Sequence, residues 1–444
     1  MIFLILFLGL VIRLISLNQS FWLDEATSML STKMSLTHFF SNFIVGDFHP
    51  PLYYLSLRFW VNLLGSNEIS ARSLSIIFAL LTIYVIFLIG KAVFNKKAGM
   101  IAALLLATSP LHIYYSQEAR MYTMSTFLAS LSVYFFTKIA KEKGRVGDFI
   151  CFSISIAFLG ITDYLPLLIL PFFWIFAILT KQKYSWWKKF IFFHLPLILI
   201  WAIWFPYFSK QLSGGLKVAS SSPLWVSILG GFSFKEILLI PTKFIIGRIS
   251  SIYVLPALPI IGYLFYKSTK SFQKTKLFFL WLFIPLFVSI LISIKIPVLN
   301  YFRFLFILPA FYLIISFGLM NIDKKLQKKL LIIIILVNIA ASFIYLRNSK
   351  YQREDWKDLS TFLNNSSVVF PSKSQREALL YYNPNANIVE PQNLNTNYKE
   401  LYLMRYVVDI TDPKDLVRER IENLNYKKTG EYDFNGVIVW KYQK

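Results

Sequence analysis

Phe21-Trp22-Leu23-Asp24-Glu25-Ala26-Thr27-Ser28 places two adjacent carboxylates after the first hydrophobic segment, Ile2–Leu17. Charged side chains at the edge of a bilayer are costly and are usually kept for function. Asp24 is therefore a candidate general base, because a carboxylate there can accept the proton of an attacking hydroxyl group. Asp24 is also suited to cap a helix over Glu25–Lys33, and the two roles are compatible.

The composition around this stretch is that of a polytopic helical membrane protein. Of the 444 residues, 56% are hydrophobic, and the mean hydropathy is +0.55, far above that of a soluble domain. The net charge of +23 belongs almost entirely to the part up to Arg347, which holds 32 Lys and Arg residues against 10 Asp and Glu residues. Since Lys and Arg set membrane topology, we expect no nucleic-acid partner.

Five short loops carry most of these cations and fix the expected topology. The loops are Lys91–Lys97, Lys138–Arg145, Lys181–Lys189, Lys267–Lys276 and Asp323–Lys329. The positive-inside rule places all five in the cytoplasm, which predicts about eleven spans in a plasma (inner) membrane, a cytoplasmic N-terminus and an extracytoplasmic C-terminal segment. The expected spans are Ile2–Leu17 (a retained anchor), about Ser73–Phe94, Ala98–Tyr115, Met121–Ile139, Phe149–Ile161, Tyr164–Leu179, Phe190–Phe208, about Ile245–Tyr266, Leu277–Ile294, Phe302–Asn321 and Leu330–Leu346.

Three regions outside these spans have a predicted structure. Pro51–Leu64 is too short for a span and is expected to be an interfacial helix in the first external loop, whereas Ser209–Thr242 is expected to be a long external loop. Residues 348–444 are expected to form a small extracytoplasmic α/β domain beside the membrane domain, residues 1–347. Its expected helices are Asp355–Leu363, Ser374–Tyr382 and Lys414–Asn423, its expected strands are Val368–Phe370, Leu401–Val408 and Val437–Lys441, and Asn383–Asn397 is expected to be a loop.

This topology sorts the ten acids of the membrane part. Glu142, Asp148 and Asp323 lie beside cytoplasmic cations. The outer side holds Asp24, Glu25, Asp47, Glu68, Glu118, Asp163 and Glu236. The asymmetry predicts an outward-facing site.

Candidate partners for Asp24 come from the other outer loops. Glu118 and Arg120 lie among tyrosines in a tight loop; they form either a local salt bridge or a second acid with an anion-binding guanidinium. His49, before Pro50-Pro51, is either a solvated turn residue or part of an anion site at a helix N-terminus. Arg72 and Arg303 are either snorkelling side chains or phosphate ligands. No second His stands at metal-ligand spacing, so no metal site is expected.

The same residues resemble the GT-C membrane glycosyltransferases, specifically glycosyltransferase family 39, related to the protein O-mannosyltransferases and the lipid A aminoarabinose transferases. The resemblance is carried, in matching order, by Phe21–Ser28, His49-Pro50-Pro51-Leu52, Ala71-Arg72-Ser73-Leu74, Ser109–Tyr122, Arg303 and Arg353-Glu354-Asp355-Trp356. It departs from the family at His49, where the lipid A branch has a lysine that touches the donor phosphate, and at Asp163-Tyr164, where many members have a His-Tyr pair.

The resemblance implies a GT-C fold and an outward-facing enzyme that moves a single sugar from a polyprenyl phosphate to an acceptor lipid, protein or glycan, with inversion. The family's base falls on Asp24, its neighbour on Glu25 and its second-loop acid on Glu118. The expected donor-phosphate ligands are His49, Arg72, Arg120 and Arg303, and Tyr53, Tyr115, Tyr122 and Asp163 are expected to line the site. The sequence requires no cofactor, although a divalent cation stays open. The alternative is a transporter or flippase of lipid-linked sugars, which would be expected to carry internal repeats and midplane charges.

Overall fold

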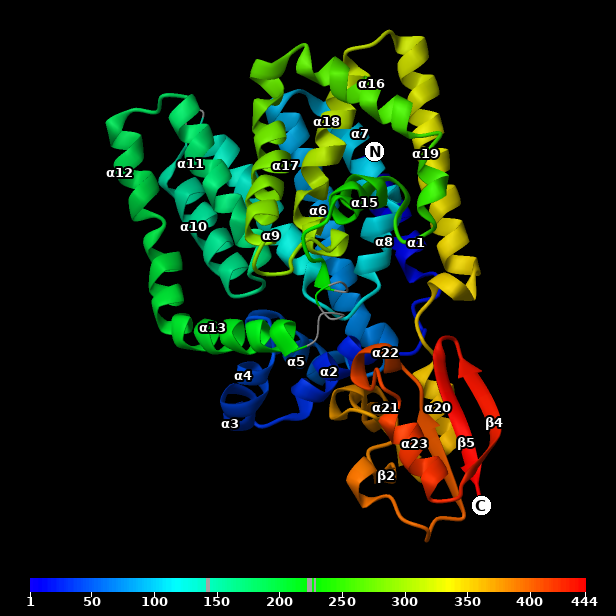
Figure 1. Ribbon diagram of the computed structural model, residues 1–444. Coiled ribbons are helices and arrows are strands. Elements are labelled where there is room, and N and C mark those ends of the chain that lie inside the picture. Colours follow the sequence, from blue (N-terminus) through cyan, green and yellow to red (C-terminus); the bar gives the residue numbers. More distant parts are fainter. Residues whose placement is uncertain (141–143, 222–225, 227–228) are drawn as a thin grey trace.

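The structure, a computed structural model, describes residues 1–140, 144–221, 226 and 229–444. Parts of the predicted Lys138–Arg145 and Ser209–Thr242 loops, including Glu142, therefore lie outside the described residues. The membrane part is a helical bundle with a small mixed α/β unit at one end (Figure 1). Its helices are α1 (Ile2–Leu14), α2 (Leu23–Lys33), α3 (Leu36–His38), α4 (Ile44–Gly46), α5 (Leu52–Leu64), α6 (Glu68–Val93), α7 (Lys96–Thr108), α8 (Pro110–Ser116), α9 (Tyr122–Ile139), α10 (Val146–Gly160), α11 (Leu170–Leu179), α12 (Tyr184–Phe192), α13 (Leu195–Ser221), α15 (Phe234–Ile246), α16 (Leu258–Thr269), α17 (Phe272–Ile292), α18 (Leu308–Met320) and α19 (Lys324–Arg347).

Among the described residues, five helical segments are long and apolar enough to cross a membrane, and the bent pair α7 and α8 makes a sixth. Three shorter apolar segments, Ile2–Leu14, Val146–Gly160 and Leu165–Leu179, coincide with predicted spans. The chain is thus an integral membrane protein, and the number of eleven spans stays a prediction. The five segments are Glu68–Val93, Tyr184–Ser220, Phe272–Ile292, Tyr301–Met320 and Lys324–Arg347.

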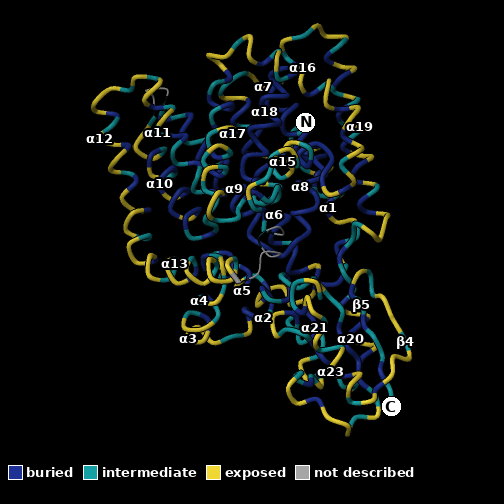
Figure 2. The backbone as a smooth tube through the Cα atoms, viewed as in Figure 1, coloured by how far each residue is buried: buried dark blue, intermediate teal, exposed yellow. Residues whose placement is uncertain are grey.

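The two ends of the bundle differ in the way the cation count predicts. The loop before α12, the loop between α16 and α17, and the start of α19 all lie at the end opposite the C-terminal unit (Figure 1). The α2–α5 segment lies at the same end as that unit, so Asp24 is far from the cation-rich loops. The buried interior is centred on α6, α7, α8 and α18, while α12 and α13 are largely exposed and α16 and α19 have one exposed side at the periphery, as Figure 2 shows.

Two predictions for the membrane part are wrong. The segment Ile245–Tyr266 is not one helix, because α15 ends at Ile246 and Gly247 adopts a positive φ of 64°. Ser209–Thr242 is not a loop throughout, because α13 extends to Ser221 and α15 begins at Phe234. The second error arose from the polar residues after Phe208, which form an exposed helical face rather than ending the helix.

The predicted span Ala98–Tyr115 is a broken helix. Here α7 and α8 meet at an angle of 60°. Pro110 has no N–H to continue the α7 ladder, and the Ser109 hydroxyl accepts a hydrogen bond from the His112 N–H, which caps α8. The break turns α8 and the following loop, with Glu118 and Arg120, toward the same end as α2.

The C-terminal unit contains one five-stranded sheet of order β2-β1-β3-β5-β4. Strand β1 is parallel to β2 and β3, while β5 is antiparallel to β3 and β4. Its strands and helices are β1 (Val368–Val369), β2 (Ile388–Val389), β3 (Glu400–Met404), β4 (Lys427–Phe434), β5 (Val437–Gln443), α20 (Trp356–Leu363), α21 (Glu377–Tyr382), α22 (Val408–Thr411) and α23 (Leu416–Asn423).

Three details of this unit correct the sequence prediction. The predicted loop Asn383–Asn397 contains strand β2, and the unpredicted β4 is an exposed edge strand whose polar residues hide its pattern. The predicted strand Leu401–Val408 ends at Met404, and Val407 adopts a left-handed conformation as the N-cap residue of α22.

Candidate active site

The acidic pair at the start of α2 splits into one buried and one exposed carboxylate. The Glu25 side chain is fully buried, whereas the Asp24 side chain is 42% exposed. Adjacent residues of a helix point about 100° apart, so one faces the bundle and the other faces its surface. The Arg120 guanidinium lies 3.7 Å from Asp24 Oδ2.

Glu25 is the anion of a buried charge cluster. Its two carboxylate oxygens accept hydrogen bonds from Arg72 Nε at 2.8 Å and Arg72 Nη2 at 2.6 Å. The Ala119 N–H donates to Glu25 Oε1 at 2.7 Å, and Arg353 Nε lies 3.4 Å from Oε2. Burial raises the pKa of Glu25, but the charge and hydrogen bonds of Arg72 more than offset it and hold the pKa below its usual value.

Arg72, predicted to bind phosphate, is fully engaged in this cluster. Besides its two bonds to Glu25, Nη1 donates to the carbonyls of Leu17 and Gln19, and Nη2 donates to the carbonyl of Ser20. All five guanidinium N–H groups are therefore used inside the protein. Arg72 fixes the chain between α1 and α2 and thereby positions Asp24.

Glu118 is also buried, but it is poorly paired. Its Oε1 lies 3.6 Å from Arg353 Nη2, and within the described chain its Oε2 makes no hydrogen bond. Burial raises the pKa of Glu118 to about 7, with Glu25 acting in the same direction and Arg353, Arg248 and Arg120 opposing it. This carboxyl group can hold or release a proton near neutral pH.

Arg120 connects the Glu118 loop to α2 and α5. Its Nη1 donates to Ser28 Oγ at 3.2 Å and to the Tyr54 hydroxyl at 3.3 Å, in addition to the Asp24 contact. Tyr54 in turn donates to Asp47 Oδ2 at 2.5 Å. Arg120 is nearly buried, and its Nε is without a hydrogen-bond partner among the described residues.

His49 belongs to the same end of the bundle. Its Nδ1 lies 3.6 Å from Asp47 Oδ2, and 24% of its side chain is exposed. Burial raises the pKa of Asp47, but the neighbouring His49 imidazole, the charge of Arg120 and the hydrogen bond from Tyr54 bring it down to about 2. Burial also raises the pKa of Asp163, against the nearby charges of His49 and Arg303.

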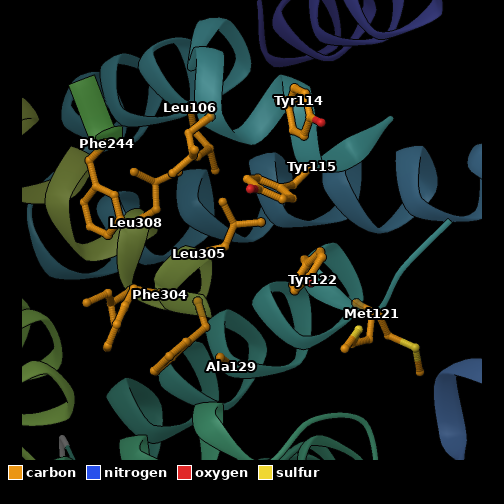
Figure 3. Packing of buried hydrophobic residues seen from close by; sticks show 14 of the residues in the cluster. Leu106, Tyr114, Tyr115, Met121, Tyr122, Ala129, Phe244, Phe304, Leu305 and Leu308 are labelled. Carbon is orange, nitrogen blue, oxygen red and sulfur yellow. The ribbon is translucent and has the colours of Figure 1, made fainter. Parts of the chain in front are cut away.

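The remaining predicted lining residues divide into two groups. Tyr115 and Tyr122 lie against one another with ring centroids 5.1 Å apart, close to Leu305 (Figure 3). Both rings also contact Phe302, next to Arg303, whose Nη1 donates to the Pro297 carbonyl at 3.0 Å. Tyr53, by contrast, is buried behind the site, with its hydroxyl 3.3 Å from Ser75 Oγ.

Two arginines at this end were not among the predicted site residues. Arg353 contacts both buried acids, and Arg248 donates from Nη1 to the Tyr114 hydroxyl while its guanidinium lies 4.6 Å from the Tyr114 ring centroid. Arg248 is exposed and follows Gly247, at the helix break that the sequence prediction missed. Arg353 belongs to one of the motifs that carry the family resemblance. Because it lies far along the chain from Glu25 and Glu118, the sequence gives no sign of its contact with them.

Among the described residues, no group of three or more His, Cys, Asp and Glu side chains is placed to hold a metal ion. The site instead combines buried acids with several cations. One carboxylate, that of Asp24, is exposed beside Arg120.

Comparisons with known proteins agree with the fold. The family model of dolichyl-phosphate-mannose-protein mannosyltransferases matches residues 48–209. Crystal structures of ArnT from Cupriavidus metallidurans, in the apo state and bound to undecaprenyl phosphate, each have a TM-score of 0.64 at 12% identity, covering 98% of this chain and 97% of theirs. A search of curated proteins gives no match.

Two further structures share the architecture more distantly. The Archaeoglobus fulgidus oligosaccharyltransferase, in a complex with zinc and sulfate, has a TM-score of 0.55 at 13% identity, covering 98% of this chain and 72% of its own. Arabinofuranosyltransferase AftD from Mycobacteria has a TM-score of 0.51 at 13% identity, covering 87% of this chain and 34% of its own.

The fold is therefore that of the GT-C membrane glycosyltransferases, and the resemblance inferred from the sequence is confirmed. Within this class, residues 48–209 match the dolichyl-phosphate-mannose-protein mannosyltransferase family.

Proposed function

We propose that this protein transfers a single sugar from a polyprenyl-phosphate donor to an acceptor on the outer side of the plasma membrane, with inversion. The observation that carries the proposal is the exposure of Asp24: its side chain is 42% exposed, against 0% for Glu25 and 2% for Glu118. A general base must reach its substrate, and of these three acids Asp24 can do so. The similarity to a transferase fold that has been seen with undecaprenyl phosphate supports the choice of donor.

The proposed reaction is a single displacement. The Asp24 carboxylate accepts the proton of the acceptor hydroxyl while the hydroxyl oxygen forms a bond to the anomeric carbon of the sugar. The bond between this carbon and the phosphate oxygen breaks, and its electron pair leaves with the polyprenyl phosphate. Because the attacking and leaving oxygens lie on opposite faces of the sugar, the anomeric configuration inverts.

The leaving phosphate is stabilised by cations rather than by a general acid. A phosphate ester leaves as an anion, so preorganised positive charge lowers its barrier. Arg120, Arg303 and Arg248 supply this charge from three separate segments, and His49 can add to it when it is protonated. We propose that these side chains suffice without a divalent cation, so transfer should persist in excess EDTA; restoration of lost activity by Mg²⁺ or Mn²⁺ would contradict this.

Transfer assays with purified protein test the function. The donors are a panel of radiolabelled polyprenyl-phosphate sugars, and the acceptors are membranes and envelope extract, which separates lipid, protein and glycan acceptors. We expect one donor to give a labelled product of inverted anomeric configuration by NMR. Movement of a donor across vesicles without transfer would instead indicate a transporter.

The variant Asp24→Asn tests the role of the base. General-base catalysis contributes about 10²–10⁴-fold, so we expect a loss of that size in kcat with unchanged folding. Glu419→Gln, an exposed carboxylate on α23, is the matched control and should keep full activity. Wild-type activity in the Asp24→Asn variant would refute the assignment.

A further inference from the structure

Arg353, at the start of the C-terminal unit, reaches into the membrane part and is 5% exposed. Arg353 lies six residues beyond the end of α19 at Arg347. Its Nε is 3.4 Å from Glu25 Oε2, and its Nη2 is 3.6 Å from Glu118 Oε1. One guanidinium therefore lies between the acid behind Asp24 and the acid of the second outer loop.

A chain of hydrogen bonds connects Arg353 to the loop that carries Glu118. Arg353 Nη1 donates to the Tyr345 hydroxyl at 3.3 Å, and this hydroxyl donates to Gln117 Oε1 at 2.9 Å. The Gln117 amide nitrogen donates to the carbonyls of Arg13 and Ile15 at 3.0 and 2.7 Å. The residue before Glu118 is thus fixed to both α1 and α19.

The sheet of the C-terminal unit holds Arg353 from the other side. The Arg353 carbonyl accepts a hydrogen bond from the Asn435 side chain at 2.6 Å, and the Asp355 N–H donates to the Phe434 carbonyl at 3.0 Å. Asn435 and Gly436, with φ angles of 50° and 96°, form the tight turn between β4 and β5, a conformation that Asn-Gly favours. The Arg353 N–H also donates to Gln19 Oε1 at 3.1 Å, just before α2.

A second contact of the C-terminal unit holds the residues that precede Asp24 in the chain. The Tyr382 hydroxyl, at the end of α21, accepts a hydrogen bond from the Phe21 N–H at 2.7 Å and donates to Glu68 Oε1 at 2.9 Å. The Phe21 ring packs edge-on against Tyr381, with centroids 5.2 Å apart. The C-terminal unit therefore contacts the segments that carry Asp24 and those that carry Glu118.

We infer that Arg353 is a positioning residue of the active site: the docked C-terminal unit places its guanidinium between Glu25 and Glu118 and so fixes the geometry and charge of Glu118. The inference rests on the proposed glycosyltransferase function. It makes the C-terminal unit part of the catalytic assembly rather than an appended binding module.

The pH dependence of transfer separates this role from a merely structural one. The charged groups that act on Glu118 are Arg353, Glu25, Arg248 and Arg120. Since Arg353 opposes the rise in the pKa of Glu118, removal of its charge should raise that pKa further. The limb of the pH–kcat profile that reports Glu118 should move to higher pH in Arg353→Gln, whichever protonation state is active.

The experiment measures kcat, KM and the pH profile for full-length wild type, Arg353→Gln, Arg353→Lys and Arg418→Gln. We expect Arg353→Gln to lower kcat at least about tenfold and shift the limb upward, Arg353→Lys to restore the position of the limb, and Arg418→Gln, a surface control in the same unit, to match wild type. A folded Arg353→Gln variant with the wild-type kcat and profile would overturn the inference.

Tyr345→Phe carries the same test if Arg353→Gln does not fold. It removes only the hydroxyl that joins Arg353 to Gln117, and a smaller loss of kcat with a shift in the same direction is expected; an unchanged profile overturns the inference. Inactive wild-type protein on every donor would instead refute the proposed function, so the two failures are distinguishable.

Discussion

Glu25 and Asp24 are sequence neighbours with opposite physical tasks. Glu25 faces Arg72 and Arg353 in the interior, where a charge without a partner is far more costly than at the surface. Asp24 faces the surface, where its carboxylate is accessible to a substrate. The adjacent carboxylates therefore combine structural support with the candidate base within one turn of α2.

The variant Glu25→Gln should destabilise the protein. It leaves the buried Arg72 guanidinium without an anion and removes one of the two carboxylates beside Arg353. Loss of one partner of a buried pair costs about 3–5 kcal/mol. Glu431→Gln is the control, because the exposed Lys428–Glu431 pair, with 35% and 51% exposed side chains, contributes only about 0–1 kcal/mol. Thermal unfolding in detergent should show a lower midpoint for Glu25→Gln alone; equal midpoints for the two variants would contradict the assignment.

Glu118 should make stability depend on pH near neutrality. Burial raises its pKa from 4.5 to about 7, so between these values the folded state binds more protons than the unfolded state, and stability falls as pH rises. The loss is about 3 kcal/mol across this window. Glu118→Gln should remove this pH-dependent loss of stability. The test is to measure the unfolding midpoints of both proteins at pH 5 and at pH 8. If the unfolding midpoint of the wild-type protein changes with pH no more than that of the variant, Glu118 is not the source of the pH dependence.

At the scale of the elements, the breaks in the helices bring the site cations to their places. The bend between α7 and α8 directs the Glu118–Arg120 loop toward α2. The break after α15 exposes Arg248, and Gly247 permits it because its φ of 64° and its approach to Pro110 exclude a side chain. A Cβ atom at Gly247 would lie 3.0 Å from Pro110 Cβ.

The variant Gly247→Ala should both destabilise the protein and weaken donor binding. This backbone conformation, with φ 64° and ψ −143°, is largely restricted to glycine and costs about 1–3 kcal/mol for a residue with a Cβ atom. A shifted turn also moves Arg248 away from Tyr114. Gly262→Ala is the control, because this glycine lies inside α16 with open space around its Cβ position. We expect a higher KM for the donor and a lower unfolding midpoint only for Gly247→Ala. Equal changes of KM and midpoint in both variants would contradict the role of the Gly247 turn in positioning Arg248.

The elements predictable from the sequence are those with a strong local signal. Long apolar runs such as Leu330–Leu346, and the charge pattern of their loops, give the helices and their polarity directly. The break at Gly247 was missed because Pro110, which leaves no room for a Cβ atom there, is distant in the sequence. The contact of Arg353 with Glu118 spans 235 residues of chain, and no local pattern reports such a distance. The functional split between Asp24 and Glu25 likewise needed the position of Arg72.

The two ends of the whole molecule differ in the segments and charges that they carry. The C-terminal unit lies at the same end as α2 and α5, and the cation-rich loops lie at the opposite end (Figure 1). Because Lys and Arg are retained on the cytoplasmic side, this arrangement predicts that Asp24, His49 and Arg120 lie on the extracytoplasmic side. An acceptor would then approach through the region bounded by α2 and the C-terminal unit, while the donor lipid would enter from the bilayer.

Labelling of introduced cysteines tests this orientation. Cys151 is the sole native cysteine, so a Cys151→Ser background is free of other thiols. Lys444→Cys, at the C-terminus, should react with a membrane-impermeant maleimide in intact cells or spheroplasts. Lys270→Cys, in the loop between α16 and α17, should react only after the membrane is permeabilised. The reverse pattern would place the C-terminal unit in the cytoplasm and move the proposed site with it, because Arg353 and Tyr382 hold that unit against the segments that carry Asp24 and Glu118.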